Sequence, residues 1–349
     1  MSPGNFLRPL LLVLVSLFLQ AHAFLSIAPR ALPQRQVGLD RGRGGRAAAT
    51  AASSFAMSSG KPSSAADKLR DLLSRPEILT MPCVYDGLTA RLVEDAGFPL
   101  TFMTGFGVSG AHGLPDTQLL SYAEMLASAT NICSTLRDIP CIGDGDTGYG
   151  NALNVKRTVK GYAQAGLAGI MIEDQVAPKR CGHTKGKTVV GREEAYSRVR
   201  AACDARWSEG ADILIMARTD ARAGLGLEEA LERCKEFRKI GADITFLEAP
   251  QSEEEMRRYC QEVDGPKLAN MLEFGKTPIL PPAELEKMGY AIAAYPLSLL
   301  SASIKAMNSA LARLKAGEPL DDLLEGFEEV QRVVGFRDYD TTAEKYKID

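Results

Sequence analysis

Short apolar segments alternate with longer amphipathic segments along most of this chain. Eight runs of three to five mainly apolar residues have the composition of buried strands: 82–85, 100–103, 140–143, 169–172, 213–217, 244–247, 267–269 and 291–294. Apolar residues between them recur with the period of a helix, as they do before the first strand at 65–73, and later at 154–165, 192–207, 227–240 and 253–262. Eight strands in strict alternation with helices predict an α/β fold, a (β/α)8 TIM-type barrel, with a doubly wound open sheet as the alternative.

Two further features of the sequence refine this prediction. No Gly-x-Gly-x-x-Gly motif follows the first predicted strand, which weakens the dinucleotide-binding version of the open sheet. Two long helical patterns, at 297–315 and 320–334, follow the eighth strand and exceed what eight βα units need. We expect these C-terminal helices to pack on a partner subunit or to cap the barrel.

The first 60 residues differ in composition from the rest. An apolar run at 10–19 follows Arg8 and leads to the small-residue sequence Ala21-His22-Ala23, which is typical of a secretory signal peptide over 1–23. Residues 24–60 carry five arginines against the single acid Asp40, with many alanines and serines, as a transit peptide does. A bipartite plastid presequence is therefore predicted, with secretion or another endomembrane compartment as the alternative, and 61–349 is expected to form one barrel domain.

Composition limits the kinds of partner that the protein can have. The chain is 45% hydrophobic and 24% charged, which is typical of a globular protein rather than a disordered or fibrous one. Its formal net charge of −3 gives no indication of a nucleic-acid partner or of an anionic membrane surface for the mature protein. The seven cysteines include no Cys-x-x-Cys pair, so we expect mostly buried thiols and no disulfide framework.

Polar residues follow nearly every predicted strand. A barrel enzyme builds its active site from the carboxyl ends of its strands and the loops behind them. The residues at those positions are Thr104, Gly105, Phe106, Asp144, Asp146, Glu173, Asp174, Arg218, Thr219, Asp220, Glu248 and Asn270. Solvated loops are also polar, but polar groups at six strand ends together indicate a site.

Three of these residues form a candidate metal site. Asp144 and Asp146 are two residues apart, so both can face the same side, and Glu173 ends the next strand. Carboxylates without histidine or cysteine suit Mg²⁺ or Mn²⁺, which keep several waters and leave positions for substrate oxygens. The alternative is that these carboxylates have no metal role, with one aspartate capping a helix and the other two acidic residues forming a pair on the surface. Arg218 is the natural partner for a substrate carboxylate, because its planar guanidinium can donate two parallel hydrogen bonds.

The loop 177–187, "APKRCGHTKGK", offers a different chemistry. Cys181 and His183 are only two ligands, whereas a structural zinc site needs four. The segment "GHTKGKT" is one residue shorter between its glycines than a phosphate-binding loop. The remaining interpretation is electrostatic, since nearby cations would lower the pKa of Cys181: Lys179, Arg180, His183 and Lys185. An incidental cysteine in a basic loop is the alternative.

Five ordered motifs resemble those of a known superfamily. They are "GDGDTGYG" at 143–150, "IEDQ" at 172–175, "KRCGH" at 179–183, "ARTDA" at 217–221 and "LANMLEFGKTP" at 268–278. Together they resemble the isocitrate lyase/phosphoenolpyruvate mutase superfamily, from about Asp67 to Gly335. Within it, the chain looks most similar to plant plastid carboxyvinyl-carboxyphosphonate phosphorylmutases, and next to 2-methylisocitrate lyases.

The resemblance implies a fold, an assembly and roles for individual residues. It implies a barrel whose eighth helix is exchanged between subunits of a homotetramer built as a dimer of dimers. Asp144 would contact Mg²⁺ directly, with Asp146 and Glu173 holding its waters. Substrate-binding residues would be Thr104, Gly105, Phe106, Gly182, His183, Arg218, Glu248 and Asn270. Asp116 would lie near the reacting centre, and Lys179–His183 would form a gating loop in which Cys181 protonates an enolate.

The same resemblance implies an activity, with two departures. It implies a Mg²⁺-dependent carbon–carbon lyase that cleaves a small 2-hydroxy di- or tricarboxylate of the 2-methylisocitrate or alkylmalate type. The methylisocitrate lyases carry tyrosine where this chain has Phe102, and the oxaloacetate hydrolases carry serine where it has Pro296. The alternatives are a carboxyvinyl-carboxyphosphonate phosphorylmutase, which Cys181 argues against because phosphoenolpyruvate mutase lacks it, and a catalytically silent barrel that serves as a binding subunit.

Overall fold

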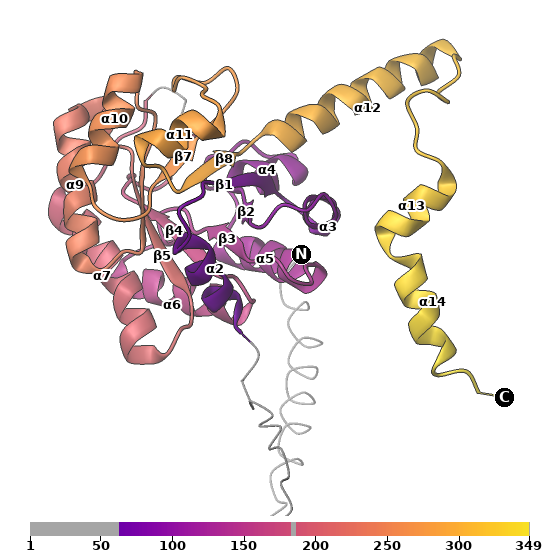
Figure 1. Cartoon of the computed structure of the whole chain (residues 1–349), viewed down its shortest axis with the longest axis horizontal. Coiled ribbons are helices and arrows are strands. Elements are labelled where there is room, and N and C mark those ends of the chain that lie inside the picture. The colour runs from indigo at the N-terminus through magenta and orange to yellow at the C-terminus, as the bar shows by residue number, and fades with distance from the viewer. Residues whose placement is uncertain (1–62, 183–185, 349) are drawn as a thin grey trace, which may run out of the picture. The chain divides into compact units, whose positions relative to one another are not determined.

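Parallel strands form the centre of the fold in a computed structural model that describes residues 63–182 and 186–348 (Figure 1). Within these residues the strands are β1 (Leu79–Val84), β2 (Thr101–Met103), β3 (Cys141–Asp144), β4 (Gly169–Glu173), β5 (Leu214–Thr219), β6 (Ile244–Leu247), β7 (Leu268–Asn270) and β8 (Ile292–Tyr295). Each overlaps one of the eight predicted strands, with shifts of at most three residues at their ends.

The strands close into a barrel. Their order is β6-β5-β4-β3-β2-β1-β8-β7, and β1 pairs in parallel with both β2 and β8. One isolated parallel bridge, between Thr245 and Lys267, joins the remaining edges of β6 and β7. The predicted (β/α)8 barrel is therefore confirmed, and the open sheet was the wrong alternative.

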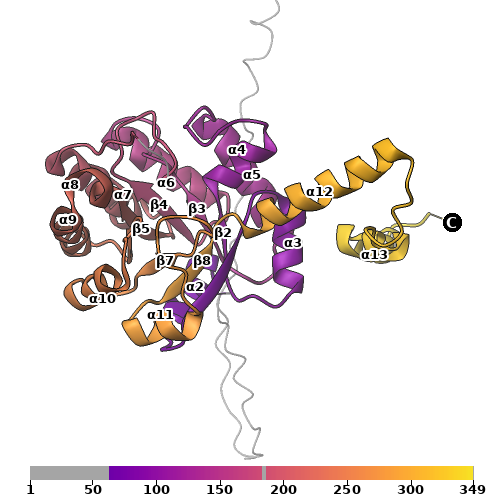
Figure 2. The same ribbon diagram turned by 90° about the horizontal axis from the view of Figure 1, so that it is seen from above.

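Helices surround the strands (Figures 1 and 2). They are α3 (Gly87–Asp95), α4 (Gly105–Ala111), α5 (Tyr122–Thr135), α6 (Ala152–Gln164), α7 (Arg192–Glu209), α8 (Ala221–Leu225), α9 (Leu227–Ile240), α10 (Glu253–Glu262) and α11 (Pro282–Met288). Local sequence sets several of their ends: the Asn151 side chain accepts hydrogen bonds from the first turn of α6, and Gly241 ends α9 in the left-handed conformation.

The barrel interior is apolar up to the carboxyl ends of the strands. Met81, Phe102, Ile142, Met171 and Met216 belong to one buried cluster inside it. The same cluster includes Ala66, Leu69 and Leu72 of α2 (Ala65–Leu73), so this helix packs against the barrel core. A second cluster joins the outer faces of β1–β5 to the helices around them. This packing provides a rigid frame for side chains at the strand ends.

The C-terminal helices depart in part from the prediction. α12 (Ser298–Ala316) forms as expected, but the helix predicted over 320–334 is wrong in its first half, because α13 spans only Phe327–Val334. Gly317 ends α12 in the left-handed conformation, and Gly326 is the N-cap of α13, with an extended backbone. A further helix, α14 (Phe336–Glu344), was not predicted.

These three helices do not cap the barrel. α12 projects from it in both views, and no residue of α12, α13 or α14 is buried (Figures 1 and 2). Their exposed apolar side chains include Leu311, Leu314, Phe327, Phe336 and Tyr339. The predicted packing on a partner subunit stays a prediction.

Two other sequence predictions concern the thiols and the N-terminal segment. All seven cysteines are free, and four of them are buried: Cys83, Cys141, Cys203 and Cys234. The signal peptide predicted at 1–23 and the transit-like segment at 24–60 lie outside the described residues. Among the helices that are described, none is long and apolar enough to cross a membrane.

Candidate active site

The alternation of side chains along each strand carries polar groups to one end of the barrel. Side chains two residues apart on a strand face the same side. Phe102, Ile142, Met171, Met216, Phe246 and Leu268 lie in the apolar interior, and two residues after each come Thr104, Asp144, Glu173, Arg218, Glu248 and Asn270. The barrel interior therefore continues directly into a ring of polar groups at the carboxyl ends of the strands.

A cavity of about 600 Å³, its open mouth included, lies at this ring. Predicted site residues that line it are Thr104, Phe106, Asp116, Asp144, Lys179, Cys181, Gly182, Arg218, Glu248 and Asn270. Asp146 and Glu173 are buried behind them, with exposed fractions of 3% and 1%. His183 lies outside the described residues. The structure thus brings the residues of six strand ends and of the cysteine loop to one place.

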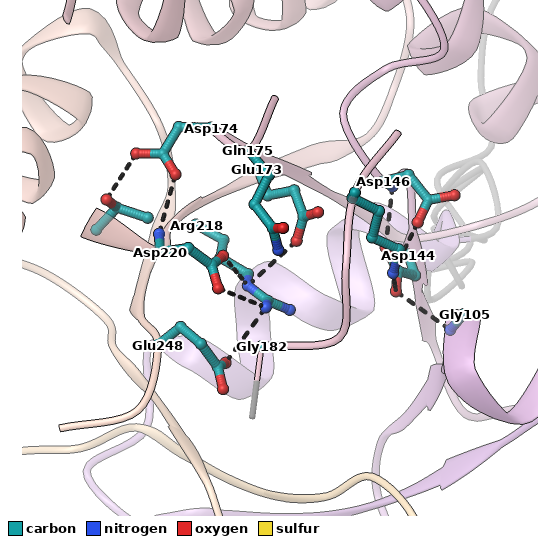
Figure 3. Close-up of polar contacts among 12 residues, drawn as sticks. Gly105, Asp144, Asp146, Glu173, Asp174, Gln175, Gly182, Arg218, Asp220 and Glu248 are labelled. Carbon is teal, nitrogen blue, oxygen red and sulfur yellow. Dashed lines mark hydrogen bonds and ion pairs between the residues drawn. The ribbon is translucent and has the colours of Figure 1, made fainter. Parts of the chain in front are cut away.

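Asp144 is held in a defined orientation. Its two carboxylate oxygens accept hydrogen bonds from the backbone N–H groups of Gly105, at 3.2 Å, and of Asp146, at 2.9 Å (Figure 3). A Cβ atom at position 105 would lie 2.5 Å from the Asp144 carboxylate, so this position accepts only glycine without a shift of its neighbours. The Asp144 carboxylate is therefore fixed in one orientation at the end of β3.

Lys179 belongs to the loop 177–187, called the cysteine loop below. Its side chain enters an acidic cluster formed by Asp116, Asp144, Asp146 and Glu173. Its Nζ atom lies 2.8 Å from Asp116, 2.8 Å from Asp146 and 3.7 Å from Asp144, and its side chain is 3% exposed. Burial lowers the pKa of Lys179, but the surrounding carboxylates outweigh burial and raise it well above its usual range. Lys179 thus remains charged and neutralises part of the cluster.

The donors of the cluster fit a hard cation held partly through water. Oε1 of Glu173 is buried without a hydrogen-bond partner, whereas Glu173 Oε2 lies 3.3 Å from Nε of Arg218 and Asp146 Oδ1 lies 2.8 Å from Nζ of Lys179. Burial raises the pKa of Glu173 well above its usual range, against the lowering effect of Arg218 and Lys179. Within the described residues, no three histidine, cysteine or acidic side chains converge as a ready ligand group. Mg²⁺ needs only one or two carboxylates besides water, so this set suits it.

The buried carboxyl of Asp146 leads to a stability prediction. Burial raises the pKa of Asp146 to about 6, against the lowering effect of Lys179, so this group binds its proton more tightly in the folded protein than in the unfolded chain. In EDTA, protonation of Asp146 therefore contributes to the free energy of unfolding at low pH. This contribution falls by about 1–3 kcal/mol as the pH rises from about 4 to about 6. The Asp146→Asn variant should be more stable than the wild type at about pH 7.5 and nearly equal at about pH 4, as urea titrations would measure. A difference that is the same at both pH values would contradict this.

Arg218 lies at the centre of a second group of carboxylates. Its guanidinium donates to both oxygens of Asp220, at 2.8 and 3.1 Å, and lies 3.3 Å from Glu173 and 3.7 Å from Glu248 (Figure 3). It also stacks over the Phe246 ring, 5.1 Å from the centroid. Burial lowers the pKa of Arg218, but these carboxylates outweigh burial and raise it well above its usual range. A permanently charged, oriented guanidinium thus reaches the cavity.

Two glutamines hold the start of the cysteine loop. Gln175 and Arg180 exchange hydrogen bonds, because the Gln175 amide accepts from the Arg180 N–H at 3.0 Å and donates to the Arg180 carbonyl at 2.8 Å. Gln118 accepts from the Lys179 N–H at 3.1 Å. Cys181 is half-buried and lines the cavity beyond these contacts. The lowered pKa of Cys181 stays a prediction.

Several residues around the site were missed by sequence reasoning. They are Cys83, Gln118, Gln175 and Lys187, together with Asp174 and Asp220, which were identified only as polar strand ends. Asp174 accepts from the Asp220 N–H and from Arg233, and so supports the Arg218 strand end from behind. The signal for Asp174 and Gln175 was their position directly after β4. No pattern in the sequence distinguished Lys187 from the other cations of its loop.

The fold and the site together define the class of protein. A (β/α)8 barrel that gathers an acidic cluster, an oriented arginine and a half-buried cysteine in one cavity at its strand ends has the architecture of a barrel enzyme. The family model described as phosphoenolpyruvate phosphomutase matches residues 69–315. The chain belongs to this family, within the phosphoenolpyruvate mutase/isocitrate lyase superfamily.

Two characterised relatives are similar over most of their length. The chain is 46% identical to 2,3-dimethylmalate lyase from Eubacterium barkeri over 72% of this chain and 86% of that protein. It is 40% identical to the chloroplastic carboxyvinyl-carboxyphosphonate phosphorylmutase from Arabidopsis thaliana, over 75% and 79%. The resemblance predicted from the motifs is therefore confirmed.

Solved structures of this superfamily superpose on the chain and support the family assignment. The crystal structure of a 2,3-dimethylmalate lyase superposes with a TM-score of 0.78 at 38% identity, covering 81% of this chain and 95% of that one. A phosphonopyruvate hydrolase in complex with oxalate and Mg²⁺ superposes with a TM-score of 0.72 at 28% identity, covering 81% and 99%. A member of the superfamily thus binds Mg²⁺ together with a dicarboxylate.

Proposed function

We propose that this protein is a Mg²⁺-dependent carbon–carbon lyase that cleaves a small 2-hydroxy di- or tricarboxylate to a 2-oxo acid and a second carboxylic acid. One observation carries the proposal: the acidic cluster, Arg218 and Cys181 all lie at the same cavity. A lyase of this kind needs a cation that binds the hydroxy acid, a guanidinium that binds a substrate carboxylate, and an acid that protonates the carbanion formed by bond cleavage. The similarity to a 2,3-dimethylmalate lyase supports it.

The metal would be held chiefly by Asp144. Its carboxylate is preorganised by two backbone N–H groups, whereas Asp146 and Glu173 are set further back and would hold waters of the metal. When bound, Mg²⁺ would neutralise negative charge that develops on the substrate oxygens during bond cleavage. The buried Oε1 of Glu173, which accepts no hydrogen bond, supports this assignment.

The protein's own groups would perform the remaining steps. Arg218 would bind a substrate carboxylate, with Thr104 and the N-terminus of α4 nearby. A carboxylate at the cavity would accept the 2-hydroxyl proton, and the C2–C3 bond would then break. C2 becomes the carbonyl carbon of the 2-oxo acid, and the electron pair passes to the other fragment as an enolate. Cys181 would donate its proton to the enolate carbon and complete the second product.

The cavity walls favour a substrate with small alkyl groups. Phe102, Leu272, Ala294 and Pro296 present apolar surface between the polar groups. Such a surface favours methyl substituents by about 1–3 kcal/mol per methylene-sized group. We therefore place the substrate among the alkylmalates, 2,3-dimethylmalate first, with 2-methylisocitrate next. Pro296 offers no hydroxyl, unlike the serine at that position of oxaloacetate hydrolases.

The test is a substrate panel assayed for 2-oxo acid release. The protein from about Ser59 onward would be incubated with 2,3-dimethylmalate, other alkylmalates and 2-methylisocitrate, with Mg²⁺ or with EDTA. We expect Mg²⁺-dependent release of pyruvate from 2,3-dimethylmalate at the highest kcat/KM. No metal-dependent cleavage of any acid in the panel would reject the lyase.

The alternative function is phosphoryl transfer between oxygen and carbon. The 40% identity to the Arabidopsis thaliana carboxyvinyl-carboxyphosphonate phosphorylmutase favours it. Phosphorus NMR with phosphonopyruvate and carboxyphosphonoenolpyruvate would detect the change from a phosphonate to a phosphate ester, or the reverse. We expect no such change in the spectrum.

The same protein would act in a plastid as a homotetramer. Residues 1–23 and 24–60 would be the two parts of its presequence, and the barrel domain would begin near Lys61. The chloroplastic relative supports a plastid location. The exposed apolar side chains of α12–α14 support exchange of these helices between subunits. Fluorescent-protein fusion of residues 1–60 and analytical ultracentrifugation would test these two points.

A further inference from the structure

Lys187 is a buried cation at the far end of the cysteine loop. Its side chain is 2% exposed, although lysine side chains are usually solvated. The ammonium lies 2.6 Å from Oδ1 of Asp220 and also donates to the backbone carbonyl of Gly182. One cation thus joins the residue directly after Cys181 to the carboxylate at the end of β5.

Asp220 is the carboxylate that orients Arg218. It accepts two hydrogen bonds from the guanidinium, and its own side chain is fully buried (Figure 3). Burial raises the pKa of Asp220, but Arg218 and Lys187 outweigh burial and hold it below the usual value. Asp220 therefore remains ionised and is shared between Lys187 and Arg218.

Gly182 lies directly beside the same guanidinium. A Cβ atom at position 182 would lie 2.4 Å from Nη2 of Arg218 and 2.7 Å from the Glu248 carboxyl carbon (Figure 3). The backbone next to Cys181 thus packs against Arg218, and small displacements of Gly182 move Cys181 relative to it. The Lys187 contact to the Gly182 carbonyl resists such displacements.

We propose that Lys187 is a positioning residue that keeps Cys181 and Arg218 in a fixed relation across the cavity, through the Gly182 carbonyl and Asp220. The proposal rests on the proposed function, in which Arg218 binds the substrate carboxylate and Cys181 supplies the proton. It assigns different tasks to the two buried lysines of the loop. Lys179 neutralises part of the acidic cluster. Lys187 instead connects the backbone beside Cys181 to Asp220, the carboxylate that orients Arg218.

The experiment compares Lys187→Met with the wild type by two measurements that need no turnover. The first is the rate of alkylation of Cys181 by iodoacetamide, followed by mass spectrometry of the peptide that contains it. We expect the rate to rise about tenfold, because Gly182 is no longer held. The second is calorimetric titration with oxalate in the presence of Mg²⁺, for which we expect about tenfold weaker binding as Arg218 loses its orientation.

Two further variants separate positioning from general loss of stability. Lys239→Met removes an exposed lysine that pairs with Glu236 on α9, and it should change neither measurement. Lys187→Arg keeps the cation and should restore both values to within about threefold of the wild type. If Lys187→Met is insoluble, Lys187→Gln replaces it, since its amide can still donate one hydrogen bond, and an intermediate alkylation rate is expected.

The proposal is overturned if Lys187→Met, or Lys187→Gln in its place, leaves both the alkylation rate and the oxalate affinity within twofold of the wild type. If the wild type cleaves none of the hydroxy acids while the alkylation and oxalate results are as expected, the proposed function fails and the positioning role of Lys187 stands. With an active substrate, Lys187→Met should also raise KM and lower kcat, because it disturbs both sides of the cavity.

Discussion

Replacing Cys181 with serine is expected to lower kcat about 10³-fold while KM for the hydroxy acid changes by less than about threefold. Serine keeps the size of the side chain, so the cavity and the contacts of Arg218 are preserved. Its hydroxyl is a far weaker acid than a thiol, so it cannot supply the proton that the enolate carbon needs. Steady-state release of the 2-oxo acid, with oxalate binding as a measure of the intact site, checks this result.

The matched control is Cys133→Ser. Cys133 is also half-buried, but it does not line the cavity, and burial raises its pKa to about 12. This variant should keep the kcat of the wild type. If Cys181→Ser turns over as fast as the wild type, the thiol has no part in proton transfer and another acid must be sought in the cavity.

Replacing Asp144 with asparagine is expected to lower kcat/KM about 10³-fold and to abolish the uptake of Mg²⁺. Asparagine keeps an oxygen that can accept from the Gly105 or Asp146 N–H, so the turn after β3 can persist. The variant lacks the negative charge that the cation needs. Calorimetric titration with MgCl₂, together with the shift of the melting temperature that Mg²⁺ produces in the wild type, measures the loss.

The control for this variant is Asp138→Asn, which changes an exposed carboxylate paired with Lys68 away from the cavity. It should bind Mg²⁺ and turn over as the wild type does. EDTA should reduce the wild type to the level of Asp144→Asn, and added MgCl₂ should restore the wild type alone. Full activity of EDTA-treated wild type would remove the metal from the proposed mechanism.

The strands and the polar strand ends were predictable because both depend on local patterns. A buried parallel strand is an apolar run of limited length. Because side chains two residues apart face the same side, the polar residue two positions after the last inward-facing apolar residue also faces the barrel interior. Asp144, Glu173 and Arg218 were found in this way, and the structure places each at the predicted end of its strand. The helix predicted over 320–334 was wrong in its first half, because apolar periodicity does not mark where a helix begins, and α13 starts only after Gly326.

The contacts of the loop cations could not be predicted. Lys179, Arg180 and Lys187 look alike in the sequence. In the structure, however, Lys179 enters the acidic cluster, Arg180 is exposed and Lys187 binds Asp220. Which carboxylate each cation meets depends on how strands more than 30 residues apart are brought together. Chain-local patterns carry no information about such distances.

By itself, the sequence determined the barrel, the residues at its strand ends and the family, because periodicity and short motifs are properties of neighbouring residues. Only the tertiary structure decided how the charges are paired: Lys179 with Asp116 and Asp146, and Lys187 with Asp220. The physical reason is that a buried charge is tolerated only beside an opposite one, and the fold alone selects which opposite charge lies within reach.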